Sequence, residues 1–111
     1  MDRAHDPILR MIEAKIDFFN KHYQCNFNDI KVKTMKSRWG SCSRKKNLCF
    51  NSRIADLPDH LIDYIVVHEL CHLREMNHSR KFWNLVAETI PHHRKFRTEL
   101  RKVGMAMRKQ V

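Results

Sequence analysis

The sequence has few of the residues that interrupt regular structure. Its 111 residues include only two glycines and three prolines, while hydrophobic residues make up 42% of the chain. This composition is typical of a folded chain with short loops and excludes a disordered or low-complexity protein. We find no internal repeat and no linker. We therefore expect residues 1–111 to form a single minimal domain with one modest core.

Long apolar runs are also missing. The longest one is Tyr64–Val67, far shorter than the roughly 20 residues that a membrane-spanning helix needs. A transmembrane helix is therefore excluded, and we expect no membrane partner. Residues 1–5 contain no apolar segment of the kind that forms the core of a signal peptide. We accordingly expect a cytoplasmic protein.

No two of the four cysteines form a CxxC pair, which argues against a zinc site built from cysteine alone. Since no secretory signal is visible, we expect reduced thiols rather than disulfides. Their expected role is to fill the core. The four residues are Cys25, Cys42, Cys49 and Cys71.

Acidic residues are scarce: 12 Asp and Glu face 22 Lys and Arg, which gives a net charge of +10. Such a surface attracts phosphate backbones without reading their sequence, although no DNA-binding motif is present. Two interpretations stay open, non-specific association with DNA and an ordinary solvated surface. The basic residues gather in two segments, one with Lys31, Lys33, Lys36, Arg38, Arg44, Lys45, Lys46 and Arg53, the other with Arg94, Lys95, Arg97, Arg101, Lys102, Arg108 and Lys109.

Periodicity predicts a helix followed by two strands. Apolar residues recur at helical spacing from about residue 7 to residue 23, after Asp6 and Pro7 provide an N-cap and a first helical position. Residues 30–34 and 48–54 alternate apolar and polar side chains, and residues 40–46 have turn composition. We therefore expect the two strands to form a β-hairpin that packs on a helix.

Three more helices are predicted after the hairpin. The first is apolar around most of its circumference, which is typical of a buried helix. The other two are amphipathic. Together the elements predict an α+β fold, in which a small hairpin or sheet packs on a buried helix with flanking helices. The expected bounds of the three helices are about 56–76, 79–91 and 93–109.

The buried helix contains the HExxH pentad His68-Glu69-Leu70-Cys71-His72. Residues four apart lie about 40° apart around a helix, so both imidazoles can bind one metal ion from the same face. Glu69 lies about 100° from His68, where its carboxylate can reach a metal-bound water without being a ligand. Without a metal, these groups would be buried in an apolar helix and would need other partners. The pentad therefore indicates a zinc site.

A third histidine extends the metal-ligand pattern. His78 follows His72 by six residues, which gives the H-x3-H-x5-H spacing that metzincins also use. Metzincins have a glycine at the position of Glu75, so we expect Asn77 to adopt a left-handed conformation and turn the chain back. Ser79 is expected to cap the next helix. We rank His78 first, and the competing third ligands that stay open are Glu88, His92 and His93.

Several segments together resemble the YgjP-like metallopeptidases. The match covers about residues 36–97, and it is far more specific than HExxH alone. The resemblance implies a zincin-like fold, with one zinc ion bound by His68, His72 and His78 and with Glu69 as the catalytic base. More distantly, the chain is similar to the SprT and WLM groups, which include proteases of DNA–protein crosslinks. The matching segments are Lys36–Ser43, Asn47-Leu48, Asn51, Tyr64–Leu73, Asn77–Ser79 and Phe82-Trp83.

Two features depart from that family. Its members are often considerably longer, with an N-terminal β-rich region, so we expect either a minimal natural protein or an excised catalytic domain. After Pro91 the family usually has an Asp-Tyr-like pair, whereas this chain has His92 and His93. No role of that pair therefore transfers to this chain.

We expect zinc-assisted hydrolysis of a peptide bond in a peptide or protein substrate. An edge of the hairpin is expected to bind an extended substrate by strand addition, and the alternative is that Lys31, Lys33 and Lys36 blunt this edge against aggregation. Trp39 is expected either to line the cleft or, more often, to pack in the core. The oligomeric state stays open. Candidates for the group that stabilises the oxyanion are Arg38, Tyr64, His92 and His93.

The main alternative is a basic nucleic-acid-binding or interaction domain with a non-catalytic zinc site. Glu69 argues against this alternative, because a structural site has no need of a base at that position. Structural zinc sites also usually have four protein ligands, and no fourth is evident. We therefore favour the enzyme.

Overall fold

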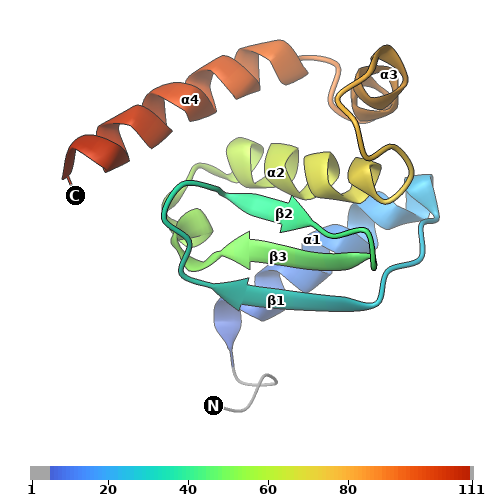
Figure 1. Ribbon diagram of the computed structural model, residues 1–111, viewed down its shortest axis with the longest axis horizontal. Coiled ribbons are helices and arrows are strands. Elements are labelled where there is room, and N and C mark those ends of the chain that lie inside the picture. Colours follow the sequence, from blue (N-terminus) through green and yellow to red (C-terminus); the bar gives the residue numbers. More distant parts are fainter. Residues whose placement is uncertain (1–5, 111) are drawn as a thin grey trace.

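The computed structural model describes residues 6–110, with side chains described up to residue 104. Figure 1 shows α1 behind the strands, α2 beside β2, and α4 beyond α2. The predicted α+β class is confirmed. In chain order the elements are α1 (Pro7–Tyr23), β1 (Asp29–Lys33), β2 (Gly40–Cys42), β3 (Asn47–Asn51), the 3-10 helix η2 (Ser52–Asp56), α2 (Asp59–His72), α3 (Arg80–Ala87) and α4 (His93–Gln110).

Helix α1 begins and ends as the sequence predicts. The carboxylate of Asp6 accepts hydrogen bonds from the backbone N–H groups of Ile8 and Leu9, at 2.9 and 3.3 Å. The helix ends where Gln24 takes a left-handed conformation, with φ of 52°, and donates its N–H to the carbonyl of Asn20. One face packs into the core, through Leu9, Ile12, Ile16, Phe19 and Tyr23.

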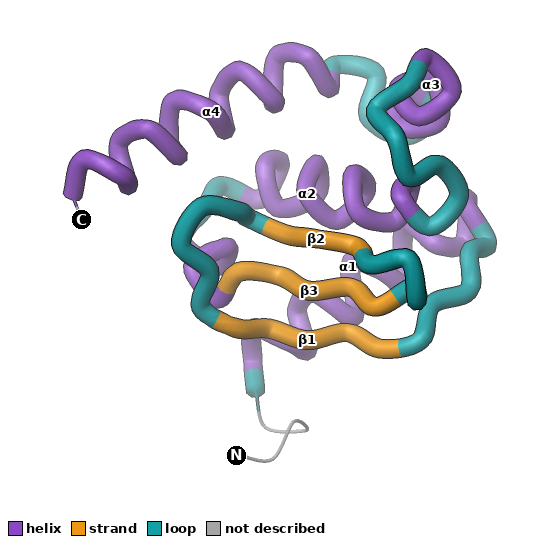
Figure 2. The backbone as a smooth tube through the Cα atoms, viewed as in Figure 1, coloured by secondary structure: helices purple, strands orange, loops and turns teal. Residues whose placement is uncertain are grey.

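The three strands form a mixed sheet in the order β1-β3-β2 (Figure 2). β1 pairs with β3 in parallel, with Ile30 opposite Leu48, and β2 pairs with β3 in antiparallel fashion. The predicted hairpin of residues 30–34 with 48–54 is therefore wrong. After β1 the chain first forms β2, on the other side of the position that β3 occupies. It then turns back to form β3, which therefore runs in the same direction as β1. The hairpin joins β2 to β3, and the turn composition of residues 40–46 hid the short strand β2.

Asn51 ends β3 and fixes the loop that precedes β2. Its side-chain oxygen accepts a hydrogen bond from the N–H of Arg53 at 3.1 Å, and residues 52–56 coil into η2 instead of continuing the strand as predicted. Its amide nitrogen donates to the carbonyls of Met35 and Arg38, at 2.9 and 2.8 Å. Asn51 is only 2% exposed. A buried amide with its donors satisfied therefore holds residues 34–39 against the sheet.

Helix α2 is buried on almost every side, as predicted. It contacts α1, β2, α3 and α4, so an apolar circumference is what its position requires. The helix ends at His72, four residues earlier than expected. Its last turn tightens because the N–H groups of Leu73 and Arg74 donate to carbonyls only three residues back, those of Leu70 and Cys71.

The cysteines and the membrane question have simple outcomes. No helix within residues 6–110 is long and apolar enough to cross a membrane. All four cysteines are free thiols, of which Cys71 is fully buried in α2 and the others are partly buried. Burial raises the pKa of the Cys71 thiol to about 12, which makes it an inert part of the core.

We predict that Phe50→Ala lowers the free energy of unfolding by about 3–5 kcal/mol, because its ring is fully buried on the central strand and its loss leaves a cavity. The measurement is urea denaturation at a fixed zinc concentration, since ligand binding shifts apparent stability. The matched control is Phe18→Ala, whose ring is 66% exposed and whose loss should change stability by less than about 0.5 kcal/mol. Equal losses in both variants would contradict this account of the core.

Candidate metal centre

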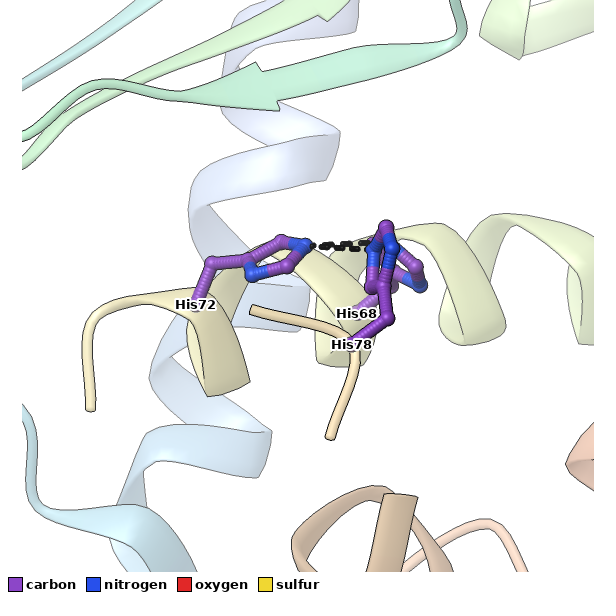
Figure 3. A group of neighbouring side chains, drawn as sticks. All are labelled: His68, His72 and His78. Atoms are coloured by element: carbon purple, nitrogen blue, oxygen red, sulfur yellow. Dashed lines mark hydrogen bonds between the residues drawn. The ribbon is translucent and has the colours of Figure 1, made fainter. Parts of the chain in front are cut away.

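Three histidines from one end of α2 and the turn after it converge on a single point (Figure 3). The Nε2 atoms of His68 and His72 are 3.2 Å apart, those of His72 and His78 are 3.0 Å apart, and those of His78 and His68 are 3.3 Å apart. All three predicted ligands are therefore brought together. Helical spacing places the first two on one face of α2, and the turn returns the third.

The turn that returns His78 also orients His72. The Nδ1 atom of His72 lies 2.9 Å from the carbonyl oxygen of Glu75. Because a carbonyl only accepts, Nδ1 carries the proton and Nε2 keeps a free lone pair. The predicted left-handed conformation of Asn77 is wrong, since within residues 6–110 only Gln24 and Lys46 have positive φ. Short-range hydrogen bonds after α2 turn the chain instead.

Helix α3 places two aromatic rings behind the histidines. Ser79 caps this helix as predicted, accepting from the N–H of Phe82 at 3.4 Å. The Phe82 ring stacks on His72 with centroids 4.4 Å apart, and the Trp83 ring stacks on His78 at 5.7 Å. These contacts restrict how the imidazole rings can rotate.

Burial favours the neutral form of the His68 and His72 imidazoles. Burial lowers the pKa of His68 to about 3, with further contributions from the neighbouring His72 and His78. Burial also lowers the pKa of His72. Neutral imidazole is the form that binds a metal ion, so the donor set suits one.

The spacing of the three nitrogens fits zinc. Zinc binds histidine nitrogen at about 2.0–2.1 Å in tetrahedral geometry, which separates ligand nitrogens by about 3.3–3.4 Å. The observed separations of 3.0–3.3 Å are close to that requirement. Metals that require six oxygen ligands fit this donor set poorly.

The competing third ligands lie elsewhere. Glu88 accepts from His22 at 2.9 Å, on a side contact between α1 and the end of α3. His93 stacks on Trp83 with centroids 5.2 Å apart, and His92 is exposed. Among the described residues, the group that converges here contains His68, His72 and His78.

Glu69 is held between α2 and the sheet. It is 5% exposed, and burial raises its pKa to about 8, although the nearby charge of Arg38 opposes the shift. A Cβ atom at Gly40 would lie 3.1 Å from both Cγ and Oε2 of Glu69 and 3.3 Å from the carbonyl of Cys49. The absence of a side chain at Gly40 is therefore what lets β2 approach the carboxylate.

A cleft of about 870 Å³ opens beside His68 and Glu69. The two positions predicted for Trp39 are both found, since its side chain lines this cleft and packs, partly buried, against the core. Among the candidate oxyanion donors, Arg38 and Tyr64 line the cleft. His92 and His93 are not among the residues that line it.

Sequence reasoning missed two features of this region. Arg97 of α4 reaches the cleft and lies 5.1 Å from the centre of the Trp83 ring, and no local motif marks it. The Glu75 carbonyl that orients His72 could not be predicted from the sequence either, because any residue supplies a carbonyl.

The hydroxyl of Tyr64 lies 3.5 Å from Nδ1 of His68, at the outer limit of hydrogen bonding.

Comparison with solved structures shows that this fold is found in metallopeptidases. The metallopeptidase zymogen abylysin of Pyrococcus abyssi superposes with a TM-score of 0.73 at 19% identity, covering 81% of this chain and 91% of that chain. The metallopeptidase zymogen jannalysin of Methanocaldococcus jannaschii superposes with a TM-score of 0.69 at 26% identity, covering 86% and 96%. No curated protein sequence matches the chain.

The family match defines the class of this protein more narrowly than the fold does. Residues 5–103 match the YgjP-like metallopeptidase domain, so the chain belongs to the YgjP-like family. The resemblance seen in the sequence is thereby confirmed. The chain is a metallopeptidase, a metal-dependent hydrolase of peptide or protein substrates.

Proposed function

We propose that His68, His72 and His78 bind one catalytic zinc ion and that Glu69 is the general base of peptide-bond hydrolysis. The observation that carries this proposal is the convergence of three Nε2 atoms within 3.0–3.3 Å of one another, next to a buried carboxylate on the same cleft. Three protein ligands leave a fourth position open, as in catalytic zinc sites.

The zinc ion and Glu69 have different roles in the proposed reaction. Zinc, when bound, supplies Lewis acidity that activates water near neutral pH and polarises the carbonyl of the substrate. Glu69 takes the proton from the attacking water and delivers it to the departing amine. Burial favours this exchange, because a carboxylate with a pKa near 8 both accepts and releases a proton close to neutral pH.

Strand β2 supports the proposed binding of an extended substrate. In the order β1-β3-β2 it is an edge strand, and its first residue, Gly40, lines the cleft. A peptide added to this edge would lie beside Glu69. Of the lysines that could blunt an edge, Lys31 and Lys33 lie on β1, the opposite edge, whereas Lys36 lies in the loop before β2 and lines the cleft.

We predict that Glu69→Gln keeps zinc but lowers the rate of peptide hydrolysis by at least about 100-fold, because the amide cannot accept the proton. The measurement pairs zinc content by atomic absorption with cleavage of a quenched fluorescent peptide. Glu13→Gln, on the exposed face of α1, is the matched control and should cleave at the normal rate. Full activity in the Glu69 variant would refute the assignment of the base.

We also predict that His78→Ala weakens zinc binding by about 100-fold or more, because one of three protein ligands is lost. Competition with a chromogenic chelator measures the affinity. His92→Ala, an exposed histidine outside the cluster, is the control and should bind zinc normally. Unchanged one-to-one zinc in the His78 variant would assign the third ligand to Glu88 or another histidine.

A second proposal concerns DNA. Of the fifteen basic residues in the two basic segments, Arg108 and Lys109 lie outside the described side chains, and the other thirteen are exposed. Exposed cations in this number favour association with a phosphate backbone, which would bring the peptidase to DNA-associated proteins.

We predict that a fluorescent DNA duplex binds at low salt and is released as salt rises, since binding of this kind is driven by counterion release. Fluorescence anisotropy over a salt series measures it, and two duplexes of unrelated sequence should bind alike. An absence of binding at low salt would remove the proposal while leaving the peptidase untouched.

A further inference from the structure

The cleft beside the three histidines carries an unbalanced charge. Among the described residues that line it, Glu69 is the only acid, and it is almost completely buried. The exposed charged side chains that a substrate in the cleft meets are therefore cations. The cations that line it are Lys36, Arg38, Arg53, Arg97 and Arg101.

These five cations have no acidic partner within the described part of the chain. The acids that form ion pairs there do so with other residues. Their partners do not line the cleft: Asp59 and Asp63 pair with Lys15, Glu88 with His22, and Glu99 with His60. The charge in the cleft is thus available to a ligand.

The cations come from two walls of the cleft, formed by different parts of the chain. Lys36, Arg38 and Arg53 lie in the loop before β2 and in η2, while Arg97 and Arg101 lie one turn apart on α4. Like charges that line one cleft repel each other, and that repulsion is relieved when an anion binds among them.

Both walls reach the reacting centre. Arg38 lines the cleft together with Glu69. Arg97 lines the cleft together with His68. Anionic groups on either side of a bond placed at His68 and Glu69 would therefore meet a cation.

The aromatic residues of the cleft favour a peptide over a nucleic acid. Proteins that bind single strands stack bases on free aromatic faces. Of the aromatic residues that line the cleft, Trp39 is packed against the core and the Tyr64 ring is in contact with His68. The edge of β2, by contrast, offers backbone partners to an extended peptide.

We infer that the cleft selects peptide segments with acidic side chains on both sides of the scissile bond. The position of that bond rests on the proposed function, whereas the preference for acidic side chains is a property of the cleft itself. Glutamate or aspartate on one side pairs with the loop cations, and on the other side with those of α4.

The test uses three labelled peptides with the same central sequence, flanked on both sides by two glutamates, two glutamines or two lysines. Binding is measured by anisotropy on the zinc-loaded Glu69→Gln protein, so that the peptides stay intact, and kcat/KM is measured on the wild type. We expect the glutamate peptide to bind about 3-fold to 10-fold more tightly than the glutamine peptide at low salt, and the lysine peptide to bind least. The preference should largely vanish near 1 M salt, where the screening length is about 3 Å.

Matched variants distinguish the effect of the cations in the cleft from the effect of the net charge of the protein. In the same protein, Arg53→Gln with Arg101→Gln should reduce the preference to about 2-fold or less. Arg10→Gln with Lys21→Gln removes the same charge from exposed positions on α1, away from the cleft, and should leave the preference unchanged.

The outcomes are distinct. Equal binding of the glutamate and glutamine peptides overturns the inference, as does an equal loss of preference in both double variants. A DNA duplex whose binding depends on Arg53 and Arg101, with no preference among the peptides, assigns the cations to nucleic acid and also overturns it. Preference in binding with no cleavage of any peptide by the wild type supports the inference and refutes the proposed function.

Discussion

Three imidazole lone pairs directed at one point are the constraint on which the rest of this structure depends. Acceptors 3.0–3.3 Å apart repel one another, and a cation between them reverses the sign of that interaction. The surrounding elements are arranged to hold them there. The last turn of α2 supplies His68 and His72, the tightened turn returns His78, and α3 places Phe82 and Trp83 behind the rings.

The same helix must form the core and present the reactive groups, and these two requirements conflict. A helix that is buried on every side offers no open face for a carboxylate, so Glu69 reaches the cleft only where β2 has no side chain in the way. Gly40 provides that position, since a Cβ atom there would lie 3.1 Å from Oε2. The close approach also removes water from the carboxyl group, and this burial is the main cause of its raised pKa.

The sequence predicted correctly those features that depend on interactions between residues close together in the chain. The caps of Asp6 and Ser79, the buried helix and the HExxH spacing depend on residues a few positions apart, and the structure agrees with each. Strand order depends on pairing between distant segments, so the parallel contact of β1 with β3 could not be read from alternation. Arg97 was missed for the same reason, because only the packing of α4 brings it to the cleft.

The net charge of +10 becomes more informative once the cations are placed in the fold. A cation on an open surface is well solvated and needs no further explanation. Cations on two walls of one cleft differ, because each wall raises the potential that the other experiences and the low-dielectric protein between them concentrates the field. Asp59, Asp63 and Glu99 pair with Lys15 and His60, which do not line the cleft, so these three carboxylates form no ion pair with its cations. The position of the charge, more than its amount, therefore distinguishes a cleft that attracts an anionic segment from a merely basic protein.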